Sequence, residues 1–272
     1  MNEYKNIHSY CSTDILLVWE VIPCMKKITI FIGSARKKTT YETIQEFESS
    51  LKQYGEFDFE YVFLSDYNLE FCQGCKLCFD KGEEFCPLKD DRNILLEKME
   101  LSDGIIIATP NYAFQVSARV KNFFDRFAYI IHRPRFFGKT FTVIVTQGIF
   151  GGNGILKYME GMGANLGFYV TKGSCVTTLE PMTELQRKKL KWEIRKSSKR
   201  FYNGIICSTP VPSFFRLMIF RITRASIQSI DMRHFDYYYY KDKGWFESDY
   251  YYDTTLGPIK KLAGRFFDFF GQ

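Results

Sequence analysis

The stretch KKITIFIGSARKKTTYETIQEF, residues 26–47, decides the fold of this chain. It opens with an apolar run, passes through a short polar loop and continues into a segment whose apolar residues have helical spacing. This pattern is one βα unit, and four more apolar runs, each trailed by a helix-like segment, follow it. The predicted strands are Lys27–Gly33, Phe57–Leu64, Gly104–Thr109, Thr140–Thr146 and Gly167–Val176, and the predicted helices are Thr40–Tyr54, Arg92–Leu101, Ser117–Tyr129, Gly154–Ala164 and Thr183–Asn203.

Strands that alternate with helices through short right-handed crossovers predict an α/β fold, a doubly wound parallel sheet of five strands with helices on both faces. We expect an N-terminal extension at residues 1–25, a sheet domain at 26–204 and a C-terminal appendage at 205–272, where the alternation stops. The appendage is expected to be irregular overall and to pack on the sheet domain. Within it, PSFFRLMIFRITR (212–224) favours an amphipathic helix packed on this chain or on a second subunit over a membrane-surface helix, and IKKLAGRFFDFF (259–270) is helix-like.

The composition is that of an ordinary globular protein of 272 residues with a net charge of +6, which excludes a disordered or fibrous chain. No stretch approaches the roughly 20 apolar residues of a membrane-spanning helix, and the N-terminal ILLVWEVIP lacks the features of a signal peptide. Much of the basic excess lies at residues 187–200, where the apolar residues share one helical face, so an amphipathic helix is favoured over a nucleic-acid surface. We therefore expect a cytoplasmic protein without nucleic-acid or membrane partners.

The loop after the first strand is a candidate anion site. Backbone N–H groups at a helix N-terminus are unpaired, hydroxyl groups can donate to phosphate oxygens, and Arg36 can pair with the charge. The loop lacks the motifs that bind ATP or a pyrophosphate, so a monophosphate fits better. Hydroxyl residues before a helix are also common as simple N-caps, and that alternative stays open. The candidate residues are Ser34, Arg36, Thr39, Thr40 and Tyr41.

Two further loops leave the same edge of the predicted sheet. The third strand runs into TPNYAFQ (109–115), where Pro110 shapes the loop and Tyr112 can lie against a flat ring. The fourth runs into TQGIFGGNG (146–154), whose glycines leave room for a ligand. One loop for a phosphate and two for a planar heterocycle predict an FMN pocket. Its further candidates are Pro110, Asn111, Tyr112, Ala113, Phe114, Thr146, Gln147 and Gly148.

A third candidate site is the cysteine-rich loop at 72–86, within FCQGCKLCFDKGEEFCP (71–87). Three thiols at successive intervals of three residues can converge on one point, which suits an iron–sulfur cluster. Zinc is an alternative, although its usual arrangement is two CxxC pairs held apart by a long insert, and inert or redox thiols are another. A disulfide fits poorly because nothing indicates a secretory context. The candidate metal ligands are Cys72, Cys75, Cys78 and Cys86.

From about residue 26 to 200 the chain resembles the flavodoxin-like NAD(P)H-dependent FMN reductases, and within them the iron–sulfur flavoproteins. The family's first loop, approximately GSPRxxSxT, is matched by Gly33, Ser34, Ala35, Arg36 and Thr39, whereas Tyr41 departs from its usual small hydroxyl residue. The second, SPxYxxxxSxxxKxFxDR, is matched by Thr109, Pro110, Tyr112, Ser117, Lys121, Phe123, Asp125 and Arg126. The resemblance implies a [4Fe–4S] cluster on the four cysteines, although the seven residues between Cys78 and Cys86 are at the long end for that motif.

The function implied by the resemblance is an FMN-dependent NAD(P)H oxidoreductase, which passes electrons through FMN and the cluster to a small-molecule or redox-protein acceptor. The flavin carries the chemistry, so no catalytic side chain is predicted, and His132 is expected to be structural. A non-enzymatic iron–sulfur flavoprotein electron carrier is the alternative, and an interaction module that has lost its cofactors is a third. The basic residues Arg36, Lys37 and Lys38 favour the enzyme, since they suit an anionic nicotinamide cofactor. We also expect a homo-oligomer.

Overall fold

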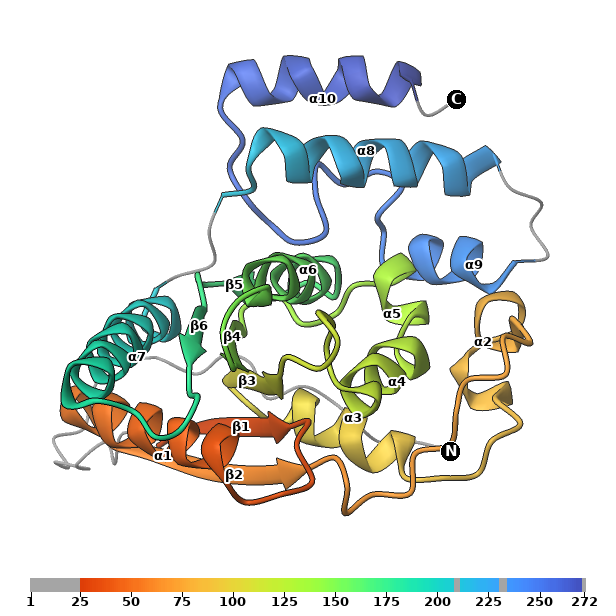
Figure 1. Cartoon of the computed structure of the whole chain (residues 1–272). Helices are drawn as coiled ribbons and strands as arrows, with labels where there is room; N and C mark the ends of the chain where they lie inside the picture. The colour runs from red at the N-terminus through yellow and green to blue at the C-terminus, as the bar shows by residue number, and fades with distance from the viewer. Residues whose placement is uncertain (1–24, 208–210, 230–233, 271–272) are drawn as a thin grey trace, which may run out of the picture.

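The computed structural model describes residues 25–207, 211–229 and 234–270, so the predicted extension lies outside the described residues except for Met25. A parallel sheet forms the centre, with strand order β2-β1-β3-β4-β5 (Figure 1). This is the flavodoxin-like doubly wound order, and the predicted fold class is confirmed. The first four strands are β1 (Lys26–Ile32), β2 (Phe57–Phe63), β3 (Gly104–Pro110) and β4 (Thr140–Gln147).

The fifth strand position is filled by two short strands. β5 (Tyr169–Val170) pairs with the start of β4 and β6 (Ser174–Thr177) with its end. Between them, Gly173 lies so close to the sheet that a Cβ would stand 2.2 Å from the carbonyl oxygen of Val143, and its N–H donates to Glu160 (2.8 Å). The single predicted strand Gly167–Val176 is therefore split, and the sheet counts six strands among the described residues.

Helices cover both faces of the sheet, as predicted (Figure 1). On one face lie α1 (Thr39–Leu51) and α7 (Glu184–Ile205), and on the other α3 (Arg92–Glu100), α4 (Ala118–Arg126) and α6 (Gly152–Asn165). The predicted helix Ser117–Tyr129 ends earlier, and a separate turn follows it. The shorter elements are the 3-10 helices η1 (Lys52–Tyr54) and η2 (Glu83–Phe85) and the α-helices α2 (Leu77–Asp80) and α5 (Tyr129–His132).

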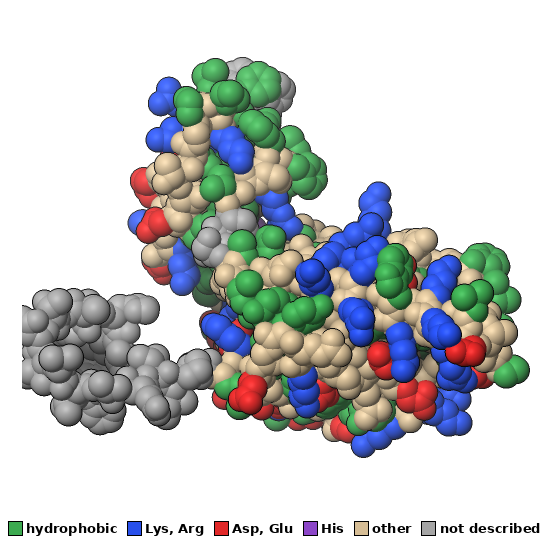
Figure 2. Space-filling view, turned by 90° about the vertical axis from the view of Figure 1, so that its left-hand side faces the viewer, with side chains coloured by type: hydrophobic (Ala, Val, Ile, Leu, Met, Phe, Trp, Pro, Cys, Tyr) green, Lys and Arg blue, Asp and Glu red, His purple; other side chains and the backbone are tan. Residues whose placement is uncertain are grey.

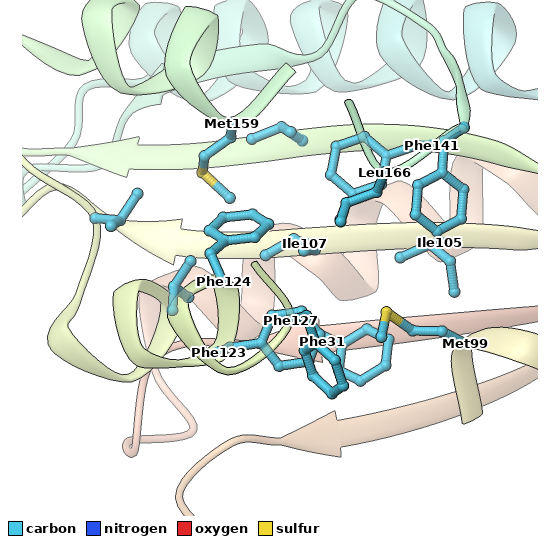
Figure 3. Packing of buried hydrophobic residues seen from close by; sticks show 14 of the residues in the cluster. Phe31, Met99, Ile105, Ile107, Phe123, Phe124, Phe127, Phe141, Met159 and Leu166 are labelled. Atoms are coloured by element: carbon cyan, nitrogen blue, oxygen red, sulfur yellow. The ribbon is translucent and has the colours of Figure 1, made fainter. Parts of the chain in front are cut away.

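The core follows from the apolar strands. Every residue of β3 is buried, as expected for a central strand of a parallel sheet. Figure 3 shows Phe123 and Phe124 of α4 close to Phe31 of β1 and Ile107 of β3. Burying each such side chain contributes roughly 1.5–3 kcal/mol to stability, so these layers hold the carboxyl ends of the strands in fixed positions.

The C-terminal appendage is more regular than expected. The helix-like segments at 212–224 and 259–270 are confirmed as helices, whereas the expectation of irregular structure was wrong for residues 235–242, which also form a helix. The appendage contains α8 (Phe214–Ser229), α9 (Phe235–Asp242) and α10 (Pro258–Phe270), and it stands above the sheet domain (Figures 1 and 2). We call residues 211–270 the C-terminal lobe. Phe220, Tyr240 and Trp245 belong to a separate hydrophobic core. Among the described residues, no helix is both long and apolar enough to cross a bilayer.

Candidate functional site

The loops after β1, β3 and β4 meet around a cavity of about 170 Å³ at the carboxyl edge of the sheet, the sheet-edge cavity. The hydroxyls of Thr40 and Thr146 lie 2.8 Å apart, which joins the first loop to the third. Two residues that the sequence analysis did not propose as ligands, Lys38 and Thr178, also line it. The predicted residues around this cavity are Ser34, Arg36, Thr39, Thr40, Pro110, Asn111, Tyr112, Thr146, Gln147 and Gly148.

Helix α1 begins at this cavity without a side-chain cap. Lys38, the residue before it, makes no capping bond, whereas α7 begins with a capping box of Thr183 and Gln186. The Ser34 hydroxyl donates to the Arg36 carbonyl (3.0 Å) and thereby shapes the turn. Unpaired N–H groups and the positive end of the helix dipole favour an anion. The start of α1 thus lacks the side-chain N-cap that was the alternative, and its N–H groups favour an anion.

A strained turn follows β3. The backbones of Tyr112 and Gln115 exchange two hydrogen bonds (3.0 and 2.9 Å), which closes a two-residue turn on Ala113 and Phe114. These two residues have φ angles of 49° and 62°, a left-handed conformation that costs non-glycine residues of order 1–3 kcal/mol each and gathers at functional sites. The Phe114 ring lies 5.5 Å from that of Phe150, so the turn rests on the loop after β4.

Three predicted cofactor residues do not line the sheet-edge cavity. Ala113 and Phe114 form the strained turn beside Tyr112. Tyr41 points elsewhere, because its ring packs 5.6 Å from Tyr61 and 5.5 Å from Phe63. A position in the first turn of α1 therefore does not bring this side chain to the cavity.

Asn111 carries an unsatisfied acceptor in the cavity wall. Its backbone N–H donates to the carbonyl of Thr146 (2.7 Å), and its side-chain Nδ2 donates to the carbonyl of Phe150 (3.0 Å). Both the backbone and the side chain of Asn111 are therefore held in place. Its Oδ1 is buried and has no hydrogen-bond partner within the described part of the chain. Such an unpaired group costs roughly 1–3 kcal/mol, and an N–H donor of a bound heterocycle would satisfy it.

The four predicted cysteine ligands line a second cavity of about 90 Å³, the cysteine cavity. Cys72 and Cys75 are exposed, and Cys78 and Cys86 are half-buried. Burial raises the pKa of the Cys78 thiol, the other three thiols raise it further, and the guanidinium of Arg133 opposes them. No three His, Cys, Asp or Glu side chains among the described residues form a group that could hold one metal ion.

A buried ion pair closes the neck of the cysteine loop. Arg126 of α4 pairs with Asp90, and their side chains are 2% and 0% exposed. Arg126 also donates to the Glu70 carbonyl (2.8 Å), and Asp90 accepts from the Glu70 N–H (2.9 Å), so the two ends of the loop are tied together. Burial would raise the pKa of Asp90, but hydrogen bonds from Arg126 and from backbone N–H groups outweigh it and hold the pKa below its usual value.

A second buried arginine joins the cysteine loop to the C-terminal lobe. Arg133 is fully buried, donates to the Cys78 carbonyl and pairs with Glu83 of the loop (3.1 Å). It also pairs with Asp236 of α9 (3.1 Å). The lobe therefore docks beside the cysteine loop. This contact could not be predicted from the sequence, because Arg133 and Asp236 are far apart along the chain.

Comparison with known proteins agrees with this architecture. Residues 26–179 match the family of NADPH-dependent FMN reductases. The chain belongs to this family. It is 34% identical over 127 residues to an iron–sulfur flavoprotein of Archaeoglobus fulgidus, an alignment that covers 46% of this chain and 61% of the relative. The chain thus spans about three fifths of the length of this relative and of a second iron–sulfur flavoprotein from the same organism.

Solved structures share the fold. An NAD(P)H:quinone oxidoreductase of Methanothermobacter marburgensis superposes with a TM-score of 0.52 at 18% identity, covering 64% of this chain and 96% of that one. RosB with a bound intermediate, 8-demethyl-8-formylriboflavin-5'-phosphate, superposes with a TM-score of 0.53 at 13% identity, covering 86% of this chain and 92% of that one. At these identities the likeness concerns the fold alone.

Proposed function

We propose that this protein is an FMN-dependent NAD(P)H oxidoreductase. The observation that carries the proposal is the sheet-edge cavity, where an uncapped helix N-terminus, the Arg36 side chain and the unpaired Asn111 Oδ1 line one space. FMN, when bound, supplies the redox chemistry by accepting a hydride from a nicotinamide cofactor and passing the electrons on. The family match supports both the flavin and the nicotinamide donor.

The chain's own residues have the task of holding and orienting the flavin. The start of α1, with Ser34, Arg36 and Thr39, is suited to the phosphate, because it combines N–H groups, hydroxyls and a positive charge. Asn111 and the strained turn at Tyr112 are suited to the heterocycle, since one offers a fixed acceptor and the other an aromatic face. The free energy of FMN binding would offset the backbone strain at Ala113 and Phe114 in that turn.

We propose in addition that the four cysteines hold a [4Fe–4S] cluster. Each thiolate of such a cluster binds a different iron, so the sulfurs stand further apart than around one zinc ion. Four thiols line one cavity, and three of them follow one another at intervals of three residues, which suits the cluster better than the two separated CxxC pairs usual for zinc. Arg126 lies 3.9 Å from the Cys86 Sγ and would offset the negative charge of the thiolates. The name of the Archaeoglobus relative supports the same proposal.

The surroundings of the protein follow from the same features. A cluster on four thiolates needs these cysteines to be reduced, so we infer a cytoplasmic location, where thiols are kept reduced. Tyr112, Phe114, Ile149 and Phe150 are between 50% and 72% exposed in the two loops beside the cavity. An exposed apolar patch of this kind favours a homo-oligomer in which a second copy covers it.

Anaerobic purification of the full chain tests the flavin. We expect one FMN per chain, identified by its visible spectrum and by chromatography after acid release, and oxidation of NADH or NADPH with ferricyanide as acceptor. A chain that takes up no FMN when incubated with it contradicts the proposal. The protein would be an electron carrier instead if reduced ferredoxin, but neither NADH nor NADPH, could reduce its bound FMN.

A pair of cysteine variants tests the cluster. Cys75→Ser should lose iron and sulfide and the electron paramagnetic resonance signal after reduction, but keep FMN, because the sheet-edge cavity does not use this thiol. Cys175→Ser is the matched control, since Cys175 lies in β6 and outside the cysteine cavity. Zinc in place of iron in the wild-type protein, or no cluster after reconstitution with iron and sulfide, would refute the cluster.

A further inference from the structure

A larger cavity lies between the C-terminal lobe and the sheet domain. It has a volume of about 950 Å³, within the roughly 300–1,000 Å³ typical of pockets for small organic ligands. Helix α8 forms one side, and α2, α5 and the end of α6 form the other (Figure 1). The α6 residues that line it include Gly161 and Ala164, whose small side chains take up little of the space. The family match ends at residue 179, so it does not include α8. We call this space the lobe cavity.

The α8 side of the lobe cavity is apolar. Phe215, Ile219 and Ile222 line it, and their spacing puts them on one face of the helix. Leu217 and Phe220, on another face of α8, are already buried in the core of the lobe. Phe215 remains 67% exposed and Ile219 43% exposed. The helix therefore has one face packed and a second apolar face that is free to contact a ligand.

Polar groups also line the cavity. The Nδ1 of His132 lies 2.9 Å from Oδ2 of Asp236, and the other oxygen of that carboxylate lies 3.1 Å from Nε of the buried Arg133. A carboxylate held in this way orients the imidazole and leaves its second nitrogen for a ligand. No hydrogen bond within the described part of the chain uses Nε2 of His132.

The charges around the lobe cavity balance. The permanently charged side chains that line it are Lys76 and Arg216 on one hand and Asp80 and Asp236 on the other, and two histidines, His132 and His234, line it as well. A charged ligand of either sign would therefore be repelled by the side chains of like charge and would also lose its hydration on entering the cavity. A neutral ligand with one polar atom avoids both of these costs. The lining thus fits an uncharged, largely apolar molecule that carries a hydrogen-bonding oxygen.

The lobe cavity and the cysteine cavity share a wall. Lys76 and Phe79, at α2, line both of them. The Phe79 ring lies 4.6 Å from the ring of His132. A ligand at His132 is consequently separated from the cysteines by little more than α2. An occupant in this position, beside a proposed redox centre, would be well placed to exchange electrons.

We propose that the lobe cavity binds a quinone, with its ring against Phe79 and the apolar face of α8 and one oxygen at Nε2 of His132. The protonated imidazole donates to a quinone carbonyl, and the neutral imidazole accepts from a hydroquinone hydroxyl. The redox part rests on the proposed function: NAD(P)H, one proton and the quinone yield NAD(P)⁺ and the hydroquinone, whose two carbonyls have become hydroxyls. This acceptor site is distinct from the sheet-edge cavity.

Calorimetric titration of the full chain, with oxidised FMN bound and no nicotinamide present, tests the site. The probe is 2,3-dimethyl-1,4-naphthoquinone, whose blocked ring positions cannot alkylate the free thiols. Ile222→Trp fills the cavity and should weaken binding at least tenfold. Ile259→Trp is the matched control, because Ile259 is 74% exposed on α10 and does not line the cavity. His132→Phe keeps an aromatic ring at this position but removes Nε2, and should weaken binding of the probe about tenfold.

Two results would overturn the inference: a wild-type chain that does not bind the probe, or equal affinities in Ile222→Trp and Ile259→Trp. If a second copy of the chain occupied the cavity, the wild-type chain would not bind the probe. Analytical sedimentation would then show an oligomer, and Ile222→Trp would disrupt that oligomer. Ferricyanide-dependent NAD(P)H oxidation separates this failure from failure of the proposed function. If that activity is intact while probe binding is absent, only the quinone site is refuted. If FMN and that activity are absent while the probe binds, the quinone site stands and the oxidoreductase proposal falls.

Discussion

The sheet-edge cavity and the cysteine loop are held in place in different ways. The loops of the cavity leave strands whose backbones are fixed by parallel pairing, as in the register of Pro110 with Thr146. The cysteine loop contains no strand, and side chains anchor it: Asp90 and Arg126 close its neck, and Arg133 fixes its middle. Backbone pairing tolerates most side-chain changes, whereas a buried charge left without its partner is costly. The cysteine loop should therefore be the more fragile region.

The largest effect is expected from Arg126→Met. This substitution leaves the buried Asp90 unpaired and removes the bond to the Glu70 carbonyl. Breaking a buried ion pair costs about 3–5 kcal/mol, so the free energy of unfolding in urea should fall by about that much, and iron binding should fall with it.

An exposed pair on the same helix provides the control. Lys121 and Asp125 pair at i,i+4 with side chains 53% and 44% exposed, so Asp125→Asn should cost about 0.3–0.5 kcal/mol. If Arg126→Met lowered the free energy of unfolding no more than Asp125→Asn does, the cysteine loop would not depend on the ion pair between Arg126 and Asp90. The comparison between the two regions would then be wrong.

The next effect in size concerns FMN. Replacing Ser34 and Thr39 together by Ala removes two hydroxyls from the sheet-edge cavity, of which that of Ser34 would turn from the Arg36 carbonyl to the phosphate when FMN binds. At roughly 1–2 kcal/mol for each bond to a charged group, FMN affinity should fall by about 2–4 kcal/mol while the fold is kept. Equilibrium dialysis against FMN measures this, with Ser65→Ala, outside the cavity, as control. Unchanged affinity would show that the phosphate lies elsewhere.

The sequence allowed prediction of what depends on local pattern. Apolar runs such as Gly104–Pro110 located the central strands, and the hydroxyl and glycine residues that follow them located the sheet-edge cavity. Contacts between residues distant in sequence could not be predicted. Asp90 and Arg126, for example, are related by no periodicity of the sequence. The strand break at Gly173 was missed for the same reason, since it depends on a close approach to Val143.

The C-terminal lobe illustrates the same limit more strongly. Residues 235–242 contain a run of tyrosines with no clear helical period, so the sequence favoured irregular structure. They form α9 because Tyr240 is buried against Trp245, with ring centroids 4.8 Å apart, in a core to which α8 contributes Leu217 and Phe220. Tertiary packing overrides weak local preference here. The lobe cavity, which exists only once α8 lies over α6, was therefore beyond prediction.

A pair of glycine substitutions should show how the sheet-edge loops depend on backbone. Gly151 has a φ of 96°, and a Cβ there would stand 2.5 Å from the Phe114 ring, so Gly151→Ala should destabilise the loop by about 1–3 kcal/mol. Gly154, three residues on in α6, has no atom within 4 Å of an added Cβ. Gly154→Ala should be neutral or slightly stabilising. Thermal unfolding compares the two variants, and equal midpoints would contradict the strain assigned to this loop.

The smallest expected effect is the change with pH in the stability that the Asp90 charge contributes, and it is confined to acid pH. Asp90 has a pKa below its usual value in the folded chain, because the hydrogen bonds from Arg126 and the backbone outweigh its burial. A lowered folded-state pKa stabilises the protein above the unfolded value, about 3.9, and this contribution is lost as the pH falls through the folded pKa. Wild type should thus exceed Asp90→Asn in free energy of unfolding at pH 6, and the gap should narrow below about pH 4. Urea unfolding of both proteins between pH 6 and pH 3 measures the gap, and because both carry every other carboxylate, their difference isolates Asp90. A gap that stays constant over this range would mean that the charge of Asp90 does not stabilise the neck, and the contrast with the backbone-held sheet edge would have to rest on packing instead.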